Sequence, residues 1–180
     1  MSAWFRYLSS FLVRKVYQRA STPHNPYLEV VYDSGKMMLN SRSVNYSFGG
    51  LHQAFADTFA ELGVMQWPFE SGLVLGLGAG SVPALLCEHP SQPRLVGVEI
   101  DGDVLGLARA YFELGGYAFL QVVEADAITF VQDDSAMYDL IIVDLFLDDT
   151  VPPAAETADF LNHLKRLLAP QGLLIYNRII

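Results

Sequence analysis

With 180 residues, of which 52% are hydrophobic and only 17% charged, the chain is long and apolar enough to bury a core, which excludes a disordered tail. Its net charge of −9 and its pI near 4.7 would repel phosphate backbones, which argues against general nucleic-acid binding. We expect instead a small-molecule substrate that is neutral or cationic.

The cysteine and histidine content argues against disulfides and metals. The single cysteine, Cys87, cannot form an internal disulfide, which favours a reducing compartment, the cytoplasm. The histidines lie far apart and none has zinc-site spacing, so we expect no metal. No apolar run reaches the roughly 18 to 20 residues needed to span a bilayer, so we expect no membrane span.

The first 19 residues carry four basic side chains and no acid. Their apolar residues recur at helical spacing, which predicts an amphipathic basic N-terminal helix. We expect this helix to pack on its own domain or on a second subunit, with a membrane-surface contact as the alternative. Exposed apolar surface here favours a homodimer. The apolar positions are Trp4, Tyr7, Leu8, Phe11 and Leu12.

Residues 27–48 alternate apolar and polar side chains around Asp33-Ser34-Gly35. This pattern predicts two or three antiparallel strands with a tight turn. We therefore expect residues 1–50 to form an N-terminal helix and a small antiparallel β region, separate from a second domain over residues 51–180.

From residue 51 the pattern changes to alternating helices and strands. A helical period over 51–62 is followed by five apolar strand candidates, each leading into a helix or the end of the chain. Such alternation predicts an α/β fold with a doubly wound, mostly parallel, Rossmann-like sheet. We expect Pro170 and Gly172 to end the last helix and start the last strand. The strand candidates are 72–78, 94–100, 120–126, 138–146 and 172–179.

Three glycines, Gly76, Gly78 and Gly80, stand at the first strand-to-helix turn. Without Cβ atoms the chain can take positive φ and let a ligand lie against its peptide groups. The alternative is a tight turn needed only for packing of the strand against the helix. Ser81 has the chemistry of a helix N-cap, and Pro83 is tolerated in the first turn.

Three carboxylates end successive strand candidates, at Glu99, Asp126 and Asp144, so we expect them at one edge of the sheet. Glu99 follows Gly80 by nineteen residues, where an acid can accept both ribose hydroxyls of a nucleotide. The alternatives are a solvated acid at Glu99 and a loop cap at Asp144. A dinucleotide fingerprint would require glycine at position 81, which is serine, so NAD is disfavoured.

The glycine pattern and "VGVEID", Val96 to Asp101, resemble the first two motifs of class I S-adenosylmethionine-dependent methyltransferases. A small antiparallel region followed by "GLGAGSVP", "VEID", "EADAITFV" and "YDLIIVDLF" resembles, more narrowly, the spermidine synthase (polyamine synthase) branch of that superfamily. The resemblance covers roughly residues 27–179. It implies S-adenosylmethionine, or its decarboxylated form, as the cofactor.

The resemblance also implies residue roles. Glu99 would hold the ribose, Asp126 would meet the adenine amino group, and Asp144 would help to deprotonate the attacking amine as the catalytic residue. The implied cofactor-binding residues are Gly76, Gly78, Ala79, Gly80, Glu99, Ile100, Asp126 and Ala127.

Several positions depart from the pattern of this branch. Ala79 replaces an aspartate that helps to hold ligand amino groups, and the segment from Asp144 to Pro152 differs from the usual Asp-Ser-Ser/Thr-Asp-Pro. The Tyr-His/Gln-Glu element is reduced to Leu51-His52-Gln53. The sequence also ends after its fifth strand, where the family fold adds a helix and two more strands, so we expect a sheet truncated at that point.

Three functions stay open from the sequence. The first is a methyltransferase acting on a small amine or hydroxyl acceptor, which can be cationic. The second is a polyamine aminopropyltransferase, and the third is a nucleotide-binding or interaction module without catalysis. We expect Cys87 to pack in the core, Trp67 and Phe69 to be core or cofactor-edge aromatics, and Asp148 and Asp149 to be solvated loop acids or an acidic lid.

Overall fold

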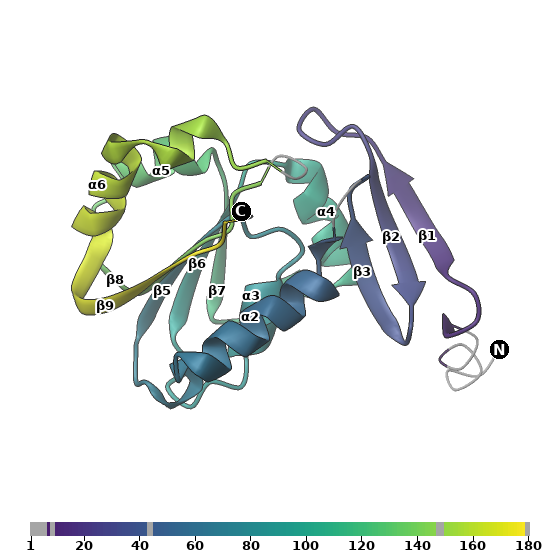
Figure 1. Ribbon diagram of the computed structural model, residues 1–180, viewed down its shortest axis with the longest axis horizontal. Helices are drawn as coiled ribbons and strands as arrows, with labels where there is room; N and C mark the ends of the chain where they lie inside the picture. The colour runs from purple at the N-terminus through teal and green to yellow at the C-terminus, as the bar shows by residue number, and fades with distance from the viewer. Residues whose placement is uncertain (1–6, 8–9, 43–44, 147–149, 179–180) are drawn as a thin grey trace.

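The computed structural model of the chain describes residues 7, 10–42, 45–146 and 150–178. Its centre is a five-stranded sheet in which every neighbouring pair of strands is parallel, in the order β7-β6-β5-β8-β9 (Figure 1). This confirms the expected doubly wound Rossmann-like sheet. The strands are β5 (Ser71–Leu75), β6 (Arg94–Glu99), β7 (Leu120–Glu124), β8 (Tyr138–Val143) and β9 (Leu168–Tyr176).

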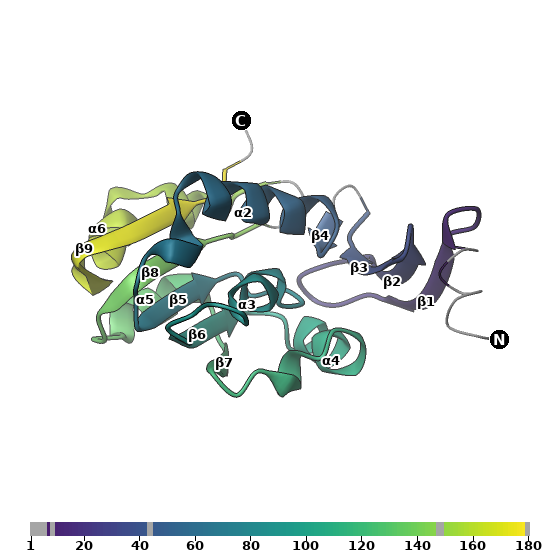
Figure 2. The same ribbon diagram turned by 90° about the horizontal axis from the view of Figure 1, so that it is seen from below.

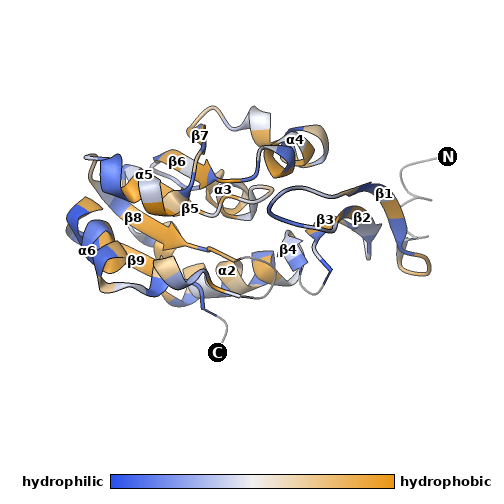
Figure 3. Cartoon of the chain, turned by 90° about the horizontal axis from the view of Figure 1, so that it is seen from above, coloured by the Kyte–Doolittle hydropathy of each residue, from blue (hydrophilic) through white to orange (hydrophobic). Residues whose placement is uncertain are grey.

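Helices cover both faces of this sheet (Figures 1 and 2). Successive strand side chains point to opposite faces, so Val74 packs with α2, α3 and α4, whereas Leu73 and Leu75 pack with α5 and α6. Coloured by hydropathy, β8 is orange between helices that carry blue outer faces, as expected of a strand buried on both sides (Figure 3). The helices are α2 (Gly50–Glu61), α3 (Ser81–Leu86), α4 (Gly102–Tyr111), α5 (Ala127–Asp133) and α6 (Ala158–Leu167), with 3-10 turns η1 (Val64–Gln66), η2 (Leu114–Gly116) and η3 (Pro153–Glu156).

A second, antiparallel sheet precedes α2, with its strands in sequence order. The predicted tight turn is present, because Ser34 and Gly35 both take positive φ, 49° and 77°. Its inner face contributes Leu28, Val30 and Leu39 to the core that also contains α2 and α4. The division of the chain at residue 50 stays a prediction. The strands are β1 (Lys15–Ala20), β2 (Leu28–Asp33), β3 (Lys36–Asn40) and β4 (Asn45–Ser47).

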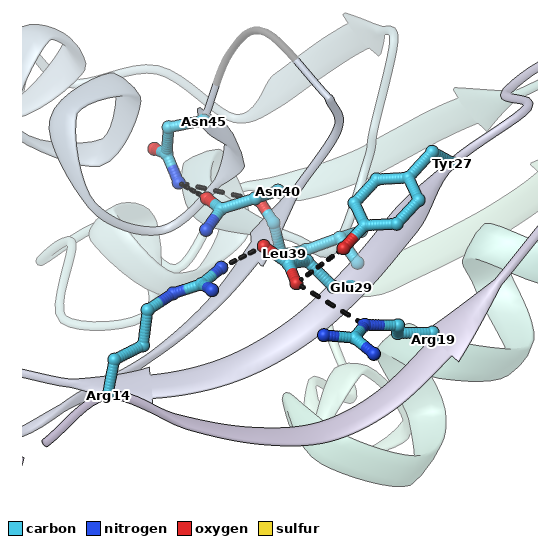
Figure 4. Close-up of polar contacts among 7 residues, drawn as sticks. All are labelled: Arg14, Arg19, Tyr27, Glu29, Leu39, Asn40 and Asn45. Carbon is cyan, nitrogen blue, oxygen red and sulfur yellow. Dashed lines mark hydrogen bonds and ion pairs between the residues drawn. The ribbon is translucent and has the colours of Figure 1, made fainter.

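Among the described residues, the predicted N-terminal helix is wrong beyond Ser10, because Phe11 and Leu12 lie in a turn and Lys15–Ala20 form β1, which pairs with β2. A buried acid on β2, Glu29, explains why this segment attaches to the sheet. Glu29 on β2 is only 7% exposed and accepts from Tyr27 (2.8 Å), while the Arg14 and Arg19 side chains reach it from the flanking segment (Figure 4). Paired charges of this kind satisfy a buried carboxylate that would otherwise destabilise the sheet. Tyr7 and Ser10 are helical, whereas Trp4 and Leu8 lie outside the described residues.

Two further expectations are corrected. Cys87 is exposed at the end of α3, so it does not pack in the core. α6 ends at Leu167 rather than at Pro170, because Leu168 already pairs with Tyr138 on β8. Pro170 therefore lies inside β9, where the register shifts. None of the helices in the described part of the chain combines the length and apolarity that crossing a bilayer requires.

Candidate functional site

A cavity of about 290 Å³ lies between the carboxyl ends of the parallel strands and the small antiparallel sheet. In this sheet β5 lies between β6 and β8, so the connections leave it in opposite directions, which is where ligands bind in open α/β sheets. The parallel strands and their following loops contribute Gly76, Leu77, Gly78, Val98, Glu99, Ile100, Ala125, Asp126, Ala127, Asp144, Leu145, Phe146 and Asn177. The N-terminal region contributes His24, Asn25, Asn45, Tyr46 and Ser47.

The glycine turn brings protein segments together as well as lining the cavity. A Cβ on Gly76, whose φ is +85°, would stand 2.1 Å from the main-chain oxygen of Asp144. A Cβ on Gly78 would be 3.2 Å from Ser47 Oγ, and one on Gly80 would be 2.8 Å from Leu114. Gly76 and Gly78 line the cavity, whereas Ala79 and Gly80 do not. All three glycines take positive φ, and Gly76 also meets the Asp144 main chain, so the conformation of the turn explains them; Gly76 and Gly78 in addition present backbone to a ligand.

Ser81 does not cap α3, because the N-cap is Gly80. Its hydroxyl instead accepts from the Phe48 amide (2.8 Å) and lies 3.2 Å from Ser47 Oγ, which accepts from the Ala79 amide (3.0 Å). The predicted cap is wrong because the hydroxyl is used between elements rather than within its own helix. These bonds fix the glycine turn to β4, and they hold Tyr46 at the cavity.

Glu99 ends β6 and is only 3% exposed. Its carboxylate accepts from the Gly78 amide through Oε2 (2.8 Å) and from the Asp101 amide through Oε1 (3.1 Å). Burial raises the pKa of Glu99, and the amide donors oppose that rise. The predicted acid is thus inside the cavity rather than in solvent, and the next residue, Ile100, lines the cavity at 38% exposure.

Asp144 follows β8 on the other side of β5. Its Oδ1 accepts from Asn177 Nδ2 at 2.8 Å, at the end of β9. Burial, together with the charge of Glu99, raises the pKa of Asp144 to about 7, although the Asn177 bond lowers it. Asn177 was not predicted. Its only sequence signal is its place directly after the fifth strand, at the edge where the acids lie.

Asp126 and Ala127 follow β7. Asp126 is exposed and caps α5, with Oδ1 accepting from the Ile128 amide at 2.7 Å. Both residues line the cavity. The structure therefore brings seven of the nine predicted residues into one cavity, and Ala79 and Gly80 belong to the same turn without lining it.

No sequence motif marks the residues that approach the cavity from the N-terminal region. The loop between β1 and β2 is tied to the main sheet by Thr22 and Asn25, whose side chains both donate to Asp101 Oδ2. This contact holds His24 and Asn25 at the cavity. Tyr46 is half-buried there, and desolvation and the charge of Glu99 raise the pKa of its phenol, so it stays neutral.

Other residues that the sequence singled out lie elsewhere. His52 does not line this cavity and stacks on Phe48 at 5.5 Å. Trp67 and Phe69 stack on each other at 5.2 Å and belong to the core rather than to the cavity edge. Asp148 and Asp149 lie outside the described residues.

The charges of the cavity indicate what it can hold. Within the ranges that the structure describes, its lining includes Glu99, Asp126 and Asp144 and no lysine or arginine. A phosphate would meet repulsion there, whereas a cation would be attracted. The lining therefore favours a ligand that carries positive charge and no phosphate.

Comparison with known proteins gives a family match. A family model described as spermine/spermidine synthase domain matches residues 53–178. A polyamine aminopropyltransferase of Chromobacterium violaceum is 33% identical over 121 residues, which cover 66% of this chain and 46% of that protein. The chain thus spans less than half the length of this curated relative.

Two solved structures are similar. A probable spermidine synthase from Corynebacterium glutamicum superposes with a TM-score of 0.71 at 22% identity, covering 91% of this chain and 63% of that one. Human methyltransferase-like protein 13 in complex with SAH superposes with a TM-score of 0.58 at 28% identity, covering 71% of this chain and 64% of that one. Both carry the same sheet architecture.

Proposed function

Because the chain belongs to the spermine/spermidine synthase domain family, we propose that its cavity binds S-adenosylmethionine and that the protein transfers the methyl group to a small amine or hydroxyl acceptor. The observation that carries this proposal is the buried Glu99 carboxylate. It accepts a hydrogen bond from the glycine turn and faces a cavity whose described lining has no lysine or arginine. The human relative that superposes on this chain is described as bound to SAH, the product of methyl transfer.

Each cofactor-binding residue that the sequence predicted has a role in this proposal. Glu99 accepts the ribose hydroxyls, Asp126 has acceptor capacity for the adenine amino group, and Ile100 and Ala127 pack against the base. Gly76 and Gly78 let the ligand approach the backbone, and Ala79 and Gly80 complete the turn. The donor supplies a carbon made electrophilic by its positive sulfur.

Asp144 is the proposed general base. It lies across the cavity from Glu99, and Asn177 fixes one of its oxygens. Holding an acceptor in line with the donor can lower the barrier by roughly 7 to 11 kcal/mol without a covalent intermediate. A carboxylate whose pKa is near 7 suits proton removal at neutral pH.

The second candidate is aminopropyl transfer from decarboxylated S-adenosylmethionine. The 33% identity to a polyamine aminopropyltransferase favours it, and an acidic cavity suits a cationic polyamine. Against it stands Ala79, because an alanine there cannot hold ligand amino groups.

Calorimetric titration with the two donors separates these functions. Tighter binding of S-adenosylmethionine supports methyl transfer, and tighter binding of the decarboxylated donor supports aminopropyl transfer. Glu99→Ala should weaken the preferred donor at least tenfold, since a hydrogen bond to a charged group contributes about 1.5–3 kcal/mol. Asp103→Asn, an exposed acid in the first turn of α4, is the matched control. If neither donor binds, the protein is a module without this transferase activity.

We further propose a homodimer in the cytoplasm. Support for the dimer comes from three consecutive apolar residues before β1: Phe11, Leu12 and Val13 are 55%, 87% and 70% exposed. Leu12→Asp should then give a monomer in light scattering, whereas Leu161→Asp, at an exposed leucine on α6, should not. A wild-type protein that is monomeric at high micromolar concentration would contradict the dimer.

A further inference from the structure

Two carboxyl groups face the same cavity, that of the buried Glu99 and that of the half-buried Asp144. Glu99 and Asp144 follow β6 and β8, the two strands on either side of β5. No lysine or arginine lines this cavity in the described part of the chain. Two negative charges that face one cavity repel each other, and the burial of Glu99 limits how far water screens that repulsion, so full ionisation of both is unfavourable while no cation is present.

The hydrogen bonds of the two groups differ. Glu99 accepts from two backbone amides, of Gly78 and Asp101, and such donors stabilise the ionised form. Within the described residues, Asp144 accepts from the side-chain amide of Asn177. The proton that relieves the repulsion therefore belongs on Asp144, in agreement with its pKa of about 7.

The other titratable groups around the cavity do not remove this need. Tyr46 on β4 is neutral because its pKa is raised. Asp126 before α5 and Asp101 before α4 add negative charge. His24, in the loop between β1 and β2, is the one imidazole in the described lining, and it is exposed to solvent, where electrostatic interactions are screened.

We propose that Asp144 determines the charge specificity of the cavity: its carboxyl group is protonated while the cavity holds no cation, and it releases that proton to solvent when a sulfonium donor binds. The inference rests on the proposed function and deepens it. A neutral thioether nucleoside brings no charge to the sulfur position, so it binds without this proton release.

The exchange prepares the base for transfer. With the cationic donor bound, Asp144 is ionised and can accept a proton from the attacking amine or hydroxyl. When the acceptor atom bonds to the methyl carbon, the carbon–sulfur bond breaks and its electron pair stays on sulfur, which becomes neutral. The acceptor's proton moves to Asp144, so cation and carboxylate become thioether and carboxylic acid, and charge balances.

Proton release is measured by titrating the full chain with S-adenosylmethionine at pH 6.5 in two buffers of different ionisation enthalpy. We expect more than about half a proton released per donor bound, and close to none with S-adenosylhomocysteine, because a group with a pKa near 7 is mostly protonated at that pH. The donor's affinity should rise several-fold from pH 6 to 8, while that of the thioether stays flat.

Variants assign the proton. Asp144→Asn should bind the donor without proton release, whereas Asp159→Asn, at an exposed acid in the first turn of α6, should match the wild type. Equal proton release by donor and thioether, or none by either, overturns the inference while the proposed function stands; these wild-type measurements need no variant to fold. If neither nucleoside binds, the proposed function falls and the inference with it.

Discussion

Asn177, which follows β9, donates a hydrogen bond to the carboxylate of Asp144, which follows β8. Its backbone amide donates to Val143 in the β8–β9 ladder, and its side-chain amide donates to Asp144 Oδ1, each at 2.8 Å. The ladder therefore fixes the residue that in turn orients the proposed base. Because Asn177 acts through Asp144, we regard it as a positioning residue.

Asn177→Ala should raise the pKa of Asp144 further, because the lost hydrogen bond is the contact that opposes burial there. The base is then ionised only at higher pH, so the acid limb of the rate–pH profile moves upward. Steady-state rates from pH 5 to 9 measure this shift. Arg178→Ala is the control at the neighbouring residue. It removes an exposed ion pair with Glu156 and should leave the rate–pH profile unchanged. An unmoved profile in Asn177→Ala would refute the positioning role.

Gly76 is required by its conformation and its surroundings. Alanine at this position would place a Cβ 2.1 Å from the Asp144 main-chain oxygen at a φ of +85°. We expect Gly76→Ala to lower the free energy of unfolding by roughly 3 kcal/mol or more. Gly106→Ala is the matched control, since it lies in α4 with nothing within 4 Å, and it should stabilise by up to about 1 kcal/mol. Urea denaturation of both variants tests the contrast, and equal stabilities would contradict it.

At the scale of the elements, the alternation of strands and helices was predictable because long apolar runs end at turn residues. β1 was not, since basic and apolar residues between Lys15 and Ala20 fit a helix as well as a strand. Its pairing with β2 and the burial of Glu29 decide between them. The ends of helices depend likewise on contacts that sequence spacing does not reveal, as at Ser81.

Helices α4 and α5 each begin with an aspartate N-cap shortly after a parallel strand. The two aspartates, Asp101 and Asp126, differ in their other partners. Asp101 is 1% exposed and also accepts from Thr22 and Asn25, whereas Asp126 is exposed and accepts from Ile128. Asp101→Ala should therefore cost roughly 3 kcal/mol, and Asp126→Ala about 1 kcal/mol. Chemical denaturation measures both. Similar losses would mean that the Thr22–Asn25 loop is not held by Asp101.

For the whole molecule, the acidic edge of the sheet was predictable, because the carboxyl ends of parallel strands meet at one edge. The far wall of the cavity was not. It depends on side chains that meet across long sequence separations, Thr22 with Asp101 and Ser47 with Ser81. No local pattern marks such pairs, so Asn25 and Tyr46 could be assigned to the cavity only from the folded chain.

The acids of the cavity also make the stability of the whole molecule depend on pH. Burial raises the pKa of Asp144 to about 7 in the folded state from its ordinary value of 3.8, so the folded state binds more protons between these two values. The contribution of Asp144 to the free energy of unfolding should therefore fall as pH rises from about 4 to 7 and level off above that range. The shift corresponds to at most roughly 4 kcal/mol, since each pKa unit is about 1.4 kcal/mol.

Asp144→Asn removes this titration and isolates its contribution from that of Glu99. The difference in unfolding free energy between Asp144→Asn and the wild type should widen in favour of the variant from pH 4 to 7 and then stay constant. Asp159→Asn should run parallel to the wild type at every pH, because its side chain is exposed. A difference between Asp144→Asn and wild type that does not change with pH would mean that Asp144 is ionised in the free protein, and the cavity would then have no proton to exchange for a cation.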